Sequence, residues 1–107
     1  MANDFKNAQN TNVTTAATVY TAPANKDSII LELDIANTSA SAVTASAEIL
    51  DSSASTDAYI VKDAPVPAGG TLQVISGQKV ILETGDSIRV SASGACDVIC
   101  SILEDVN

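Results

Sequence analysis

An alternation of apolar and polar residues, which dominates the chain from about residue 28 onward, constrains the fold more than any other sequence feature. It is clearest in the segment 28–38, SIILELDIANT. One face would carry Ile29, Leu31, Leu33 and Ile35, and the other Glu32, Asp34 and Ala36 together with Ile30. Successive side chains of a β-strand point to opposite faces, so this pattern predicts a strand with one buried and one wet face.

The same period of two, interrupted by turn residues, continues to the end of the chain. Further strands are predicted at 43–51, 57–63, 71–75, 78–83, 86–93 and 96–104, and a less regular one, rich in Thr and Ala, at 12–20. The PVPAGG segment (65–70) is expected to break the chain after residue 63, because its prolines lack a backbone donor and its glycines favour a turn. The TGD segment (84–86) predicts a tight hairpin in which Gly85 has a positive φ.

About eight strands at intervals of roughly 8–12 residues, with no helical period, are typical of an all-β protein. We therefore expect an antiparallel β-sandwich, of the jelly-roll or immunoglobulin-like type, over residues 13–107. Residues 1–12 lack a clear period and are expected to form an extended N-terminal arm. No internal repeat is found.

Charge and length restrict the partners of such a domain. The chain has 107 residues, the length of one domain, and a net charge of −8 with only 5 Lys and Arg. Nucleic acids and anionic membrane surfaces bind clustered Lys and Arg, so neither is an expected partner. No apolar run approaches the roughly 20 residues that span a bilayer. The polar start MANDFKNAQN lacks the apolar segment of a signal peptide, so synthesis in a cytoplasm is expected.

The two cysteines, Cys96 and Cys100, are expected to be reduced and buried. Four residues along a strand span about 13 Å, whereas the Cα atoms of a disulfide lie roughly 4.4–6.8 Å apart. Both cysteines share a strand face with Val98 and Ile102, as small apolar core residues would. A metal site would need further ligands, and the chain has no His and no other Cys. A redox or metal role is the alternative.

The acidic residues near the turns are interpreted as turn formers. Glu83 and Asp86 flank Thr84 and Gly85, and Asp at a turn accepts hydrogen bonds from nearby backbone N–H groups. Asp51 and Asp57 lie among the serines of the 51–57 loop, where a loose Ca²⁺ site is the alternative, although the EF-hand pattern is absent.

The residues that common catalytic sites require are missing. Without His, no Ser-His-Asp or Cys-His arrangement can form. A glycosidase would need its paired carboxyls beside a sugar-binding cleft, and the aromatics that line such clefts are scarce here. The PAGG sequence lacks the ending of a phosphate-binding loop. We therefore expect no enzymatic activity and assign no catalytic, cofactor-binding or metal-binding residue.

A resemblance to small virion structural proteins of tailed phages, particularly phages of cyanobacteria and other aquatic bacteria, is carried by residues 59–90, YIVKDAPVPAGGTLQVISGQKVILETGDSIRV. The similar parts are the Tyr-Ile-Val-Lys-Asp strand, the Pro-x-Gly-Gly loop and the Lys-Val-x-Leu-Glu-x-Gly-Asp turn. It extends to TVYTAPAN near the start and DVICSILE near the end, and covers most of residues 13–104. It implies a decoration-like or tail-associated component of the virion, assembled in the host cytoplasm, and it includes no catalytic signature.

These features together predict an outer capsid decoration or cement protein. An acidic chain is repelled by a packaged genome, which disfavours the inner capsid surface. The only aromatics are Phe5, Tyr20 and Tyr59, so the core is light, and stability is expected from contacts with the major capsid protein, other virion proteins and identical subunits. The candidate contact elements are the arm 1–12, the loops 38–42 and 51–57, and the PVPAGG loop.

Other functions stay open at this point. One is a neck, tail or fibre component of the same particle. Another is a receptor- or carbohydrate-binding module, which would favour exposed aromatics in a groove. A secreted adhesin is disfavoured, because the chain begins without a signal-peptide pattern.

Overall fold

The computed structural model describes residues 3–106, which form eight β-strands and no helix. The strands are β1 (Asp4–Val13), β2 (Ala17–Thr21), β3 (Ser28–Asn37), β4 (Val43–Asp51), β5 (Thr56–Val66), β6 (Thr71–Leu82), β7 (Ser87–Ala92) and β8 (Cys96–Glu104). The described residues therefore include no helix that is long and apolar enough to cross a membrane.

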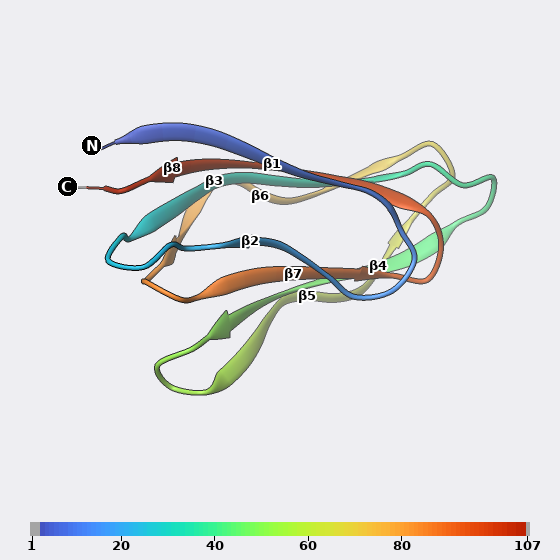
Figure 1. Ribbon diagram of the computed structural model, residues 1–107. Helices are drawn as coiled ribbons and strands as arrows, with labels where there is room; N and C mark the ends of the chain where they lie inside the picture. Colours follow the sequence, from blue (N-terminus) through green and yellow to red (C-terminus); the bar gives the residue numbers. More distant parts are fainter. Residues whose placement is uncertain (1–2, 107) are drawn as a thin grey trace.

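The strands form two four-stranded antiparallel sheets that pack face to face (Figure 1). One sheet has the order β1-β8-β3-β6, and the other has the order β2-β7-β4-β5. Among the described strands, only β4 and β5 are neighbours both in sequence and in a sheet, so nearly every connection crosses from one sheet to the other. This is the topology of a jelly roll, and it decides between the two sandwich types that the sequence left open.

The core between the sheets is aliphatic. Its largest fully buried side chains are Ile30, Leu33, Ile35, Ile75, Leu82, Ile88 and Ile102. Two of the three aromatic side chains point away from it, since Phe5 is 79% and Tyr59 53% exposed. The sandwich is therefore held together by many small and branched side chains, whose burial contributes about 25 cal/mol for each Å² removed from water.

The N-terminal segment, expected to be an arm, is strand β1 of the sandwich from Asp4 onward. It pairs with β8 from Asp4 opposite Glu104 to Val13 opposite Cys96. As an edge strand β1 leaves most side chains in solvent, and its backbone can pair with β8 whatever the side chains are. An edge strand can therefore have a polar sequence without the alternation that predicts a strand. Residues 1 and 2 of the expected arm lie outside the described residues.

The first strand expected from the sequence, residues 12–20, is interrupted. Residues 14–16 form the corner at which the chain leaves β1 and crosses to β2 in the opposite sheet. The Thr- and Ala-rich composition of this stretch gives no alternation that would mark the corner.

A β-bulge in β3 reverses part of the expected face assignment. Ile30 pairs with Ile102 and Glu32 pairs with Ser101, which leaves Leu31 as the extra residue. An extra residue shifts the side-chain parity of the strand by one position. Ile30 consequently lies in the core with Leu33 and Ile35, as predicted for the latter two, whereas Ile29 and Leu31 lie on the outer face.

Strands β5 and β6 are both longer than expected. Strand β5 continues through Pro65, because it is an edge strand and a proline there need not donate to a neighbour. The two strands expected at 71–75 and 78–83 form one strand, β6, with an irregular segment at 77–79 between them and a second register shift opposite Leu33 and Asp34. Gly77 and Lys79 have positive φ values of 111° and 57° there.

The turn at residues 84–86 is tight but is not a hairpin. It connects β6 to β7, which belong to different sheets. Gly85 has φ of +86°, as predicted, and a Cβ atom at this position would lie 2.8 Å from the Ser52 Oγ atom. The turn is therefore packed directly against the β4–β5 turn, and it tolerates only glycine without rearrangement.

We expect Gly85→Val to lower the free energy of unfolding by more than about 1 kcal/mol, through backbone strain and the clash with Ser52. The matched control is Gly69→Val, where φ is +75° and no atom lies within 4 Å of the added Cβ, so strain alone is expected. Urea unfolding of both variants measures the difference. An unchanged free energy of unfolding for Gly85→Val would contradict this role of the turn.

Candidate interaction surfaces

The two cysteines are free, buried thiols in β8, as predicted. Both side chains are fully buried on the inner face of the sheet. Burial raises the pKa of Cys100 to about 12, and burial followed by the charge of Asp97 raises that of Cys96. Because the thiolate is the reactive form, this environment suits a packing role for both residues.

Asp51 and Asp57, the two acidic residues that the sequence singled out in the 51–57 loop, have different partners in the structure. Asp57 lies 3.6 Å from the Arg89 guanidinium, which also contacts Glu48 at 2.6 Å. Asp51 instead meets Glu83 and Asp86, and ligand oxygens of these three carboxylates lie within 4.8 Å of one another. They are the residues best placed to hold a cation among those that the structure describes.

Hydrogen bonds account for this acidic cluster without a cation. The buried Asp86 carboxylate accepts bonds from the backbone N–H groups of Ser52 and Glu83, each at 3.0 Å. Asp51 accepts from Ser53 and Ala54, and these bonds lower its pKa. The bond from the Glu83 N–H within the same turn is the role that the sequence predicted for Asp86. The bond from Ser52, which joins the β4–β5 and β6–β7 turns, was not predicted.

A second buried acid, Glu104, joins strands from both sheets. Its carboxylate accepts a 2.5 Å hydrogen bond from the Tyr20 hydroxyl and lies 3.1 Å from the Lys6 ammonium. The Tyr20 hydroxyl is also 2.9 Å from the Ser28 hydroxyl. These contacts lower the pKa of Glu104, with the Tyr20 bond the largest cause. Sequence reasoning missed this network, because Tyr20 and Glu104 are 84 positions apart and Lys6 lies still farther from Glu104 in the sequence.

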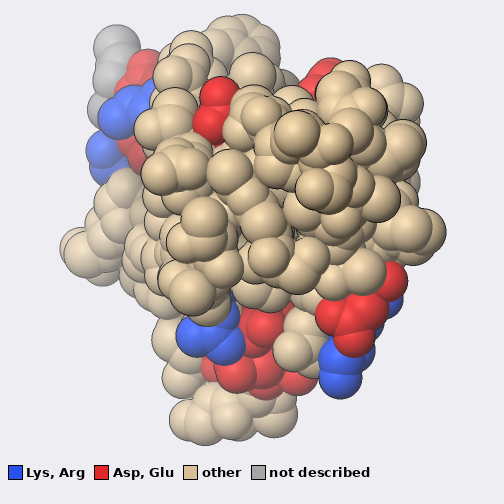
Figure 2. Space-filling view, turned by 90° about the vertical axis from the view of Figure 1, so that its right-hand side faces the viewer, with Lys and Arg blue, Asp and Glu red and all other residues tan. Residues whose placement is uncertain are grey.

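One end of the sandwich carries no charge in its loops. The connections at this end are residues 14–16, 38–42, 67–70 and 93–95, which consist of Thr, Ser, Ala, Pro and Gly. Figure 2 looks onto this end and shows a broad uncharged surface with Asp, Glu, Lys and Arg mainly at its margins. The connections at the other end contain Lys26, Asp27, Glu83 and Asp86. We call the first surface the uncharged end.

Two of the loops at the uncharged end, 38–42 and 67–70, are joined by a buried residue, Asn37. Its amide group donates to the carbonyls of Ser41 and Val66, at 2.8 and 3.0 Å, and its side-chain oxygen accepts from the backbone and hydroxyl of Ser39. The Asn37 backbone adds to this, because its N–H donates to the Gly70 carbonyl at 2.9 Å and its carbonyl accepts from the Gly69 N–H at 3.2 Å. A surface that is already ordered loses little conformational entropy when it packs against a partner.

The outer face of the β1-β8-β3-β6 sheet carries an apolar row. The row consists of Phe5, Leu103, Ile29 and Ile81, one residue from each strand in direct cross-strand register. Its two ends are the most exposed, with Phe5 79% and Ile81 61% accessible. An apolar row across a whole sheet face is typical of a contact surface.

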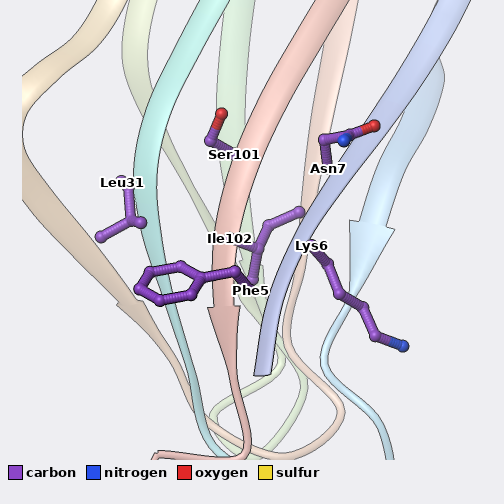
Figure 3. A pocket seen from close by; sticks show the side chains of 6 residues that line it. All are labelled: Phe5, Lys6, Asn7, Leu31, Ser101 and Ile102. Carbon is purple, nitrogen blue, oxygen red and sulfur yellow. The ribbon is translucent and has the colours of Figure 1, made fainter. Parts of the chain in front are cut away.

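A shallow pocket of about 240 Å³ adjoins this row above β8. It is lined by Phe5, Lys6, Asn7, Leu31, Ser101 and Ile102. Figure 3 shows the Phe5 ring reaching across β8 toward Leu31, while the Lys6 side chain points away. The small Ser101 side chain leaves space between larger neighbours.

An acidic pair lies on the same face next to the pocket. Glu32 is opposite Ser101, and Asp34 is opposite the half-exposed Ile99. The Asp34 Oδ1 atom is buried and has no hydrogen-bond partner among the described residues. Burial, and then the neighbouring Glu32 carboxyl, raise the pKa of Asp34 to about 6. Within residues 3–106, no Lys or Arg forms an ion pair with either carboxylate.

The fold recurs in proteins of known structure. A chain of the T13 IBDV viral particle matches with a TM-score of 0.59 at 9% identity, over 97% of this chain and 31% of that chain. A chain from the acidic stable capsid of the Helicobacter pylori bacteriophage KHP30 matches with a TM-score of 0.58 at 10% identity, over 97% and 87%. The Drosophila NLP core, whose structure concerns pentamer formation and histone binding, matches with a TM-score of 0.57 at 14% identity, over 94% and 96%.

These matches define the class of the protein as a jelly-roll β-sandwich. The chain spans about a third of the IBDV chain and most of the other two. At such low identities the similarity shows the fold alone, and the fold serves both capsids and a non-viral protein. No protein-family model matches the sequence, and no curated protein matches it either.

We expect Cys96 and Cys100 to react slowly with iodoacetamide in the folded protein at pH 8, because both are buried and their pKa values are raised. The control is the same reaction in denaturant, where both thiols should be labelled rapidly. Intact mass reports both results. Rapid labelling of the folded protein, or a mass lower by the hydrogens lost in a disulfide, would contradict the burial of free thiols.

We expect Tyr20→Phe to destabilise the protein at pH 7 by about 1–3 kcal/mol, because the Glu104 carboxylate loses a hydrogen bond. The lowered pKa of Glu104 stabilises the fold above its ordinary value of 4.5, and this contribution is lost as the pH falls through the lowered value. The difference between wild type and variant should therefore narrow below pH 4.5. Urea unfolding across this range, with the exposed Tyr59→Phe as control, measures it; a difference independent of pH would argue against an ionised Glu104.

Proposed function

We propose that the protein is a structural component of a virus particle, and more specifically a decoration or cement protein on the outer surface of a phage capsid. The observation that carries this proposal is the jelly-roll fold shared with a chain of the KHP30 phage capsid over 97% of this chain and 87% of that one. The two chains are therefore of similar size. The resemblance of residues 59–90 to small virion proteins of tailed phages supports the same role.

Electrostatics favours the outer over the inner surface of the capsid. The net charge is −8, and the packaged genome would repel it. The Lys6 and Arg89 side chains already contact carboxylates of the protein itself, which reduces what is free to neutralise phosphate. The work of the protein is then adhesion, through many copies that each bury surface against the particle.

Self-association is best supported at the uncharged end. Copies that each carry a charge of −8 repel one another, and the repulsion is weakest where the meeting surfaces have no charge. The loops at 38–42 and 67–70, two of the contact elements expected from the sequence, lie there. Clusters of identical subunits could therefore form around this end, with the charged ends directed outward.

The alternatives receive less support from the surface. A carbohydrate-binding module would use exposed aromatics in one groove, but Phe5 and Tyr59 lie in different sheets, on β1 and β5. A neck, tail or fibre component would have the same adhesive surfaces as a head protein. Imaging of the particle distinguishes these locations.

We expect label on the head, at many sites, when particles carry the protein with a C-terminal tag and are imaged by electron microscopy. The tag lies away from the uncharged end, because β8 ends at Glu104 at the opposite end of the sandwich (Figure 1). Untagged particles are the control. Label confined to the neck or tail would refute the decoration role, and its absence from particles would refute the virion role.

A further inference from the structure

The apolar row, the pocket and the acidic pair form one continuous surface on the β1-β8-β3-β6 sheet. The row containing Ile29 and Leu103 is followed along the strands by Ser101 with Glu32, and then by Ile99 with Asp34. The β3 bulge places Leu31 at the pocket beside Glu32. Apolar contact area and uncompensated negative charge therefore lie within a few residues of each other.

A second copy of the chain is a poor occupant for this surface. The acidic pair lies between the apolar row and the far end of β3, near the middle of the sheet face. A face-to-face dimer would bring two such pairs together and bury four carboxylates without a cation, which is unfavourable. A partner that supplies a cation avoids this cost and satisfies the buried Asp34 Oδ1 atom.

We propose that this face binds a segment of a different protein that inserts an apolar side chain between Phe5 and Leu31, over Ser101, and places a Lys or Arg against Glu32 and Asp34. The inference deepens the proposed function and rests on it for the partner, which would be another virion protein.

The acidic pair explains why a cationic partner would gain binding free energy at this face. At neutral pH, the raised pKa of Asp34 means that the folded protein holds an ionised carboxylate in surroundings that disfavour it. A cation placed beside the pair removes this penalty and forms charge-assisted hydrogen bonds in a partly dry site. Arg would be the better ligand, because its planar fork can contact both carboxylates. The apolar row supplies the area around this contact, and the charge selects the partner.

The test uses two extended peptides and three forms of the protein. In one peptide Leu and Arg stand two residues apart, so that both side chains point to the same face; in the other, Glu replaces Arg. The variant Glu32→Gln/Asp34→Asn removes the acids with little change in shape. The matched control, Glu83→Gln/Asp57→Asn, makes the same change in net charge at exposed positions away from this face. Ser101→Ile fills the pocket without removing charge.

We expect the Arg peptide, at up to millimolar concentration, to shift backbone NMR signals of β1, β8 and β3 around Ser101 in the wild type and in the control. Its affinity should fall about tenfold or more in the acid-free variant and in Ser101→Ile. The Glu peptide should not bind. The proposal is overturned if the Arg peptide binds the acid-free variant equally, shifts signals elsewhere or produces no shift. It is also overturned if sedimentation shows that the wild type dimerises and the NMR signals that change on dimerisation lie on this face.

A second measurement separates this proposal from the proposed function. Phage particles assembled without the protein are incubated with each purified form, and bound protein is quantified. Binding of wild type and control, but not of the acid-free variant, supports both proposals. Equal binding of all forms supports the capsid role and refutes this face as the attachment surface. Failure of every form to bind, with the peptide shifts intact, refutes the capsid role while the chemistry of the surface stands.

Discussion

The β-bulge at Leu31 sets the side-chain parity of β3, and both faces of the β1-β8-β3-β6 sheet depend on it. Strand β3 pairs with β8 on one side and β6 on the other, so its parity affects the whole sheet. On the inner face, Leu33 and Ile35 alternate into the core together with Ile30 before the bulge. On the outer face, the bulge leaves Ile29 and Leu31 exposed to a neighbour. One extra residue thus divides a run of aliphatics between folding and surface contact.

Buried carboxylate oxygens have hydrogen-bond donors at some sites of the molecule and lack them at another. Glu104 and Asp86 accept hydrogen bonds from several donors, and each ties together segments far apart in sequence. Asp34 has no such donor for its Oδ1 atom. A buried carboxylate with partners stabilises a fold, whereas one without them is a cost. The outer face of the β1-β8-β3-β6 sheet is therefore where a buried carboxylate oxygen lacks a hydrogen-bond donor among the described residues.

The two ends of the sandwich differ in charge. The loops of the uncharged end can approach identical loops, while charge at the opposite end and along the strands keeps copies apart. Asn37 holds two of these loops, 38–42 and 67–70, in place. Together with the apolar row, this gives a small domain two separate surfaces, which the proposed decoration role would use for contacts with copies and with another protein.

The alternation of side chains was enough to determine from sequence that the protein is an antiparallel β-sandwich, because period two is a property of each strand alone. The burial of Cys96 and Cys100 and the positive φ of Gly85 followed from the same local rules. The number of strands agreed only because two differences compensated: β1 was taken as an arm, and β6 was divided into two. The edge strand β1, and the continuation of the edge strand β5 through Pro65, were missed, since pairing through the backbone places few demands on side chains. The outer apolar row, the Tyr20–Glu104 contact and the acidic pair were decided by tertiary structure, because bulges and cross-strand register set which distant residues meet.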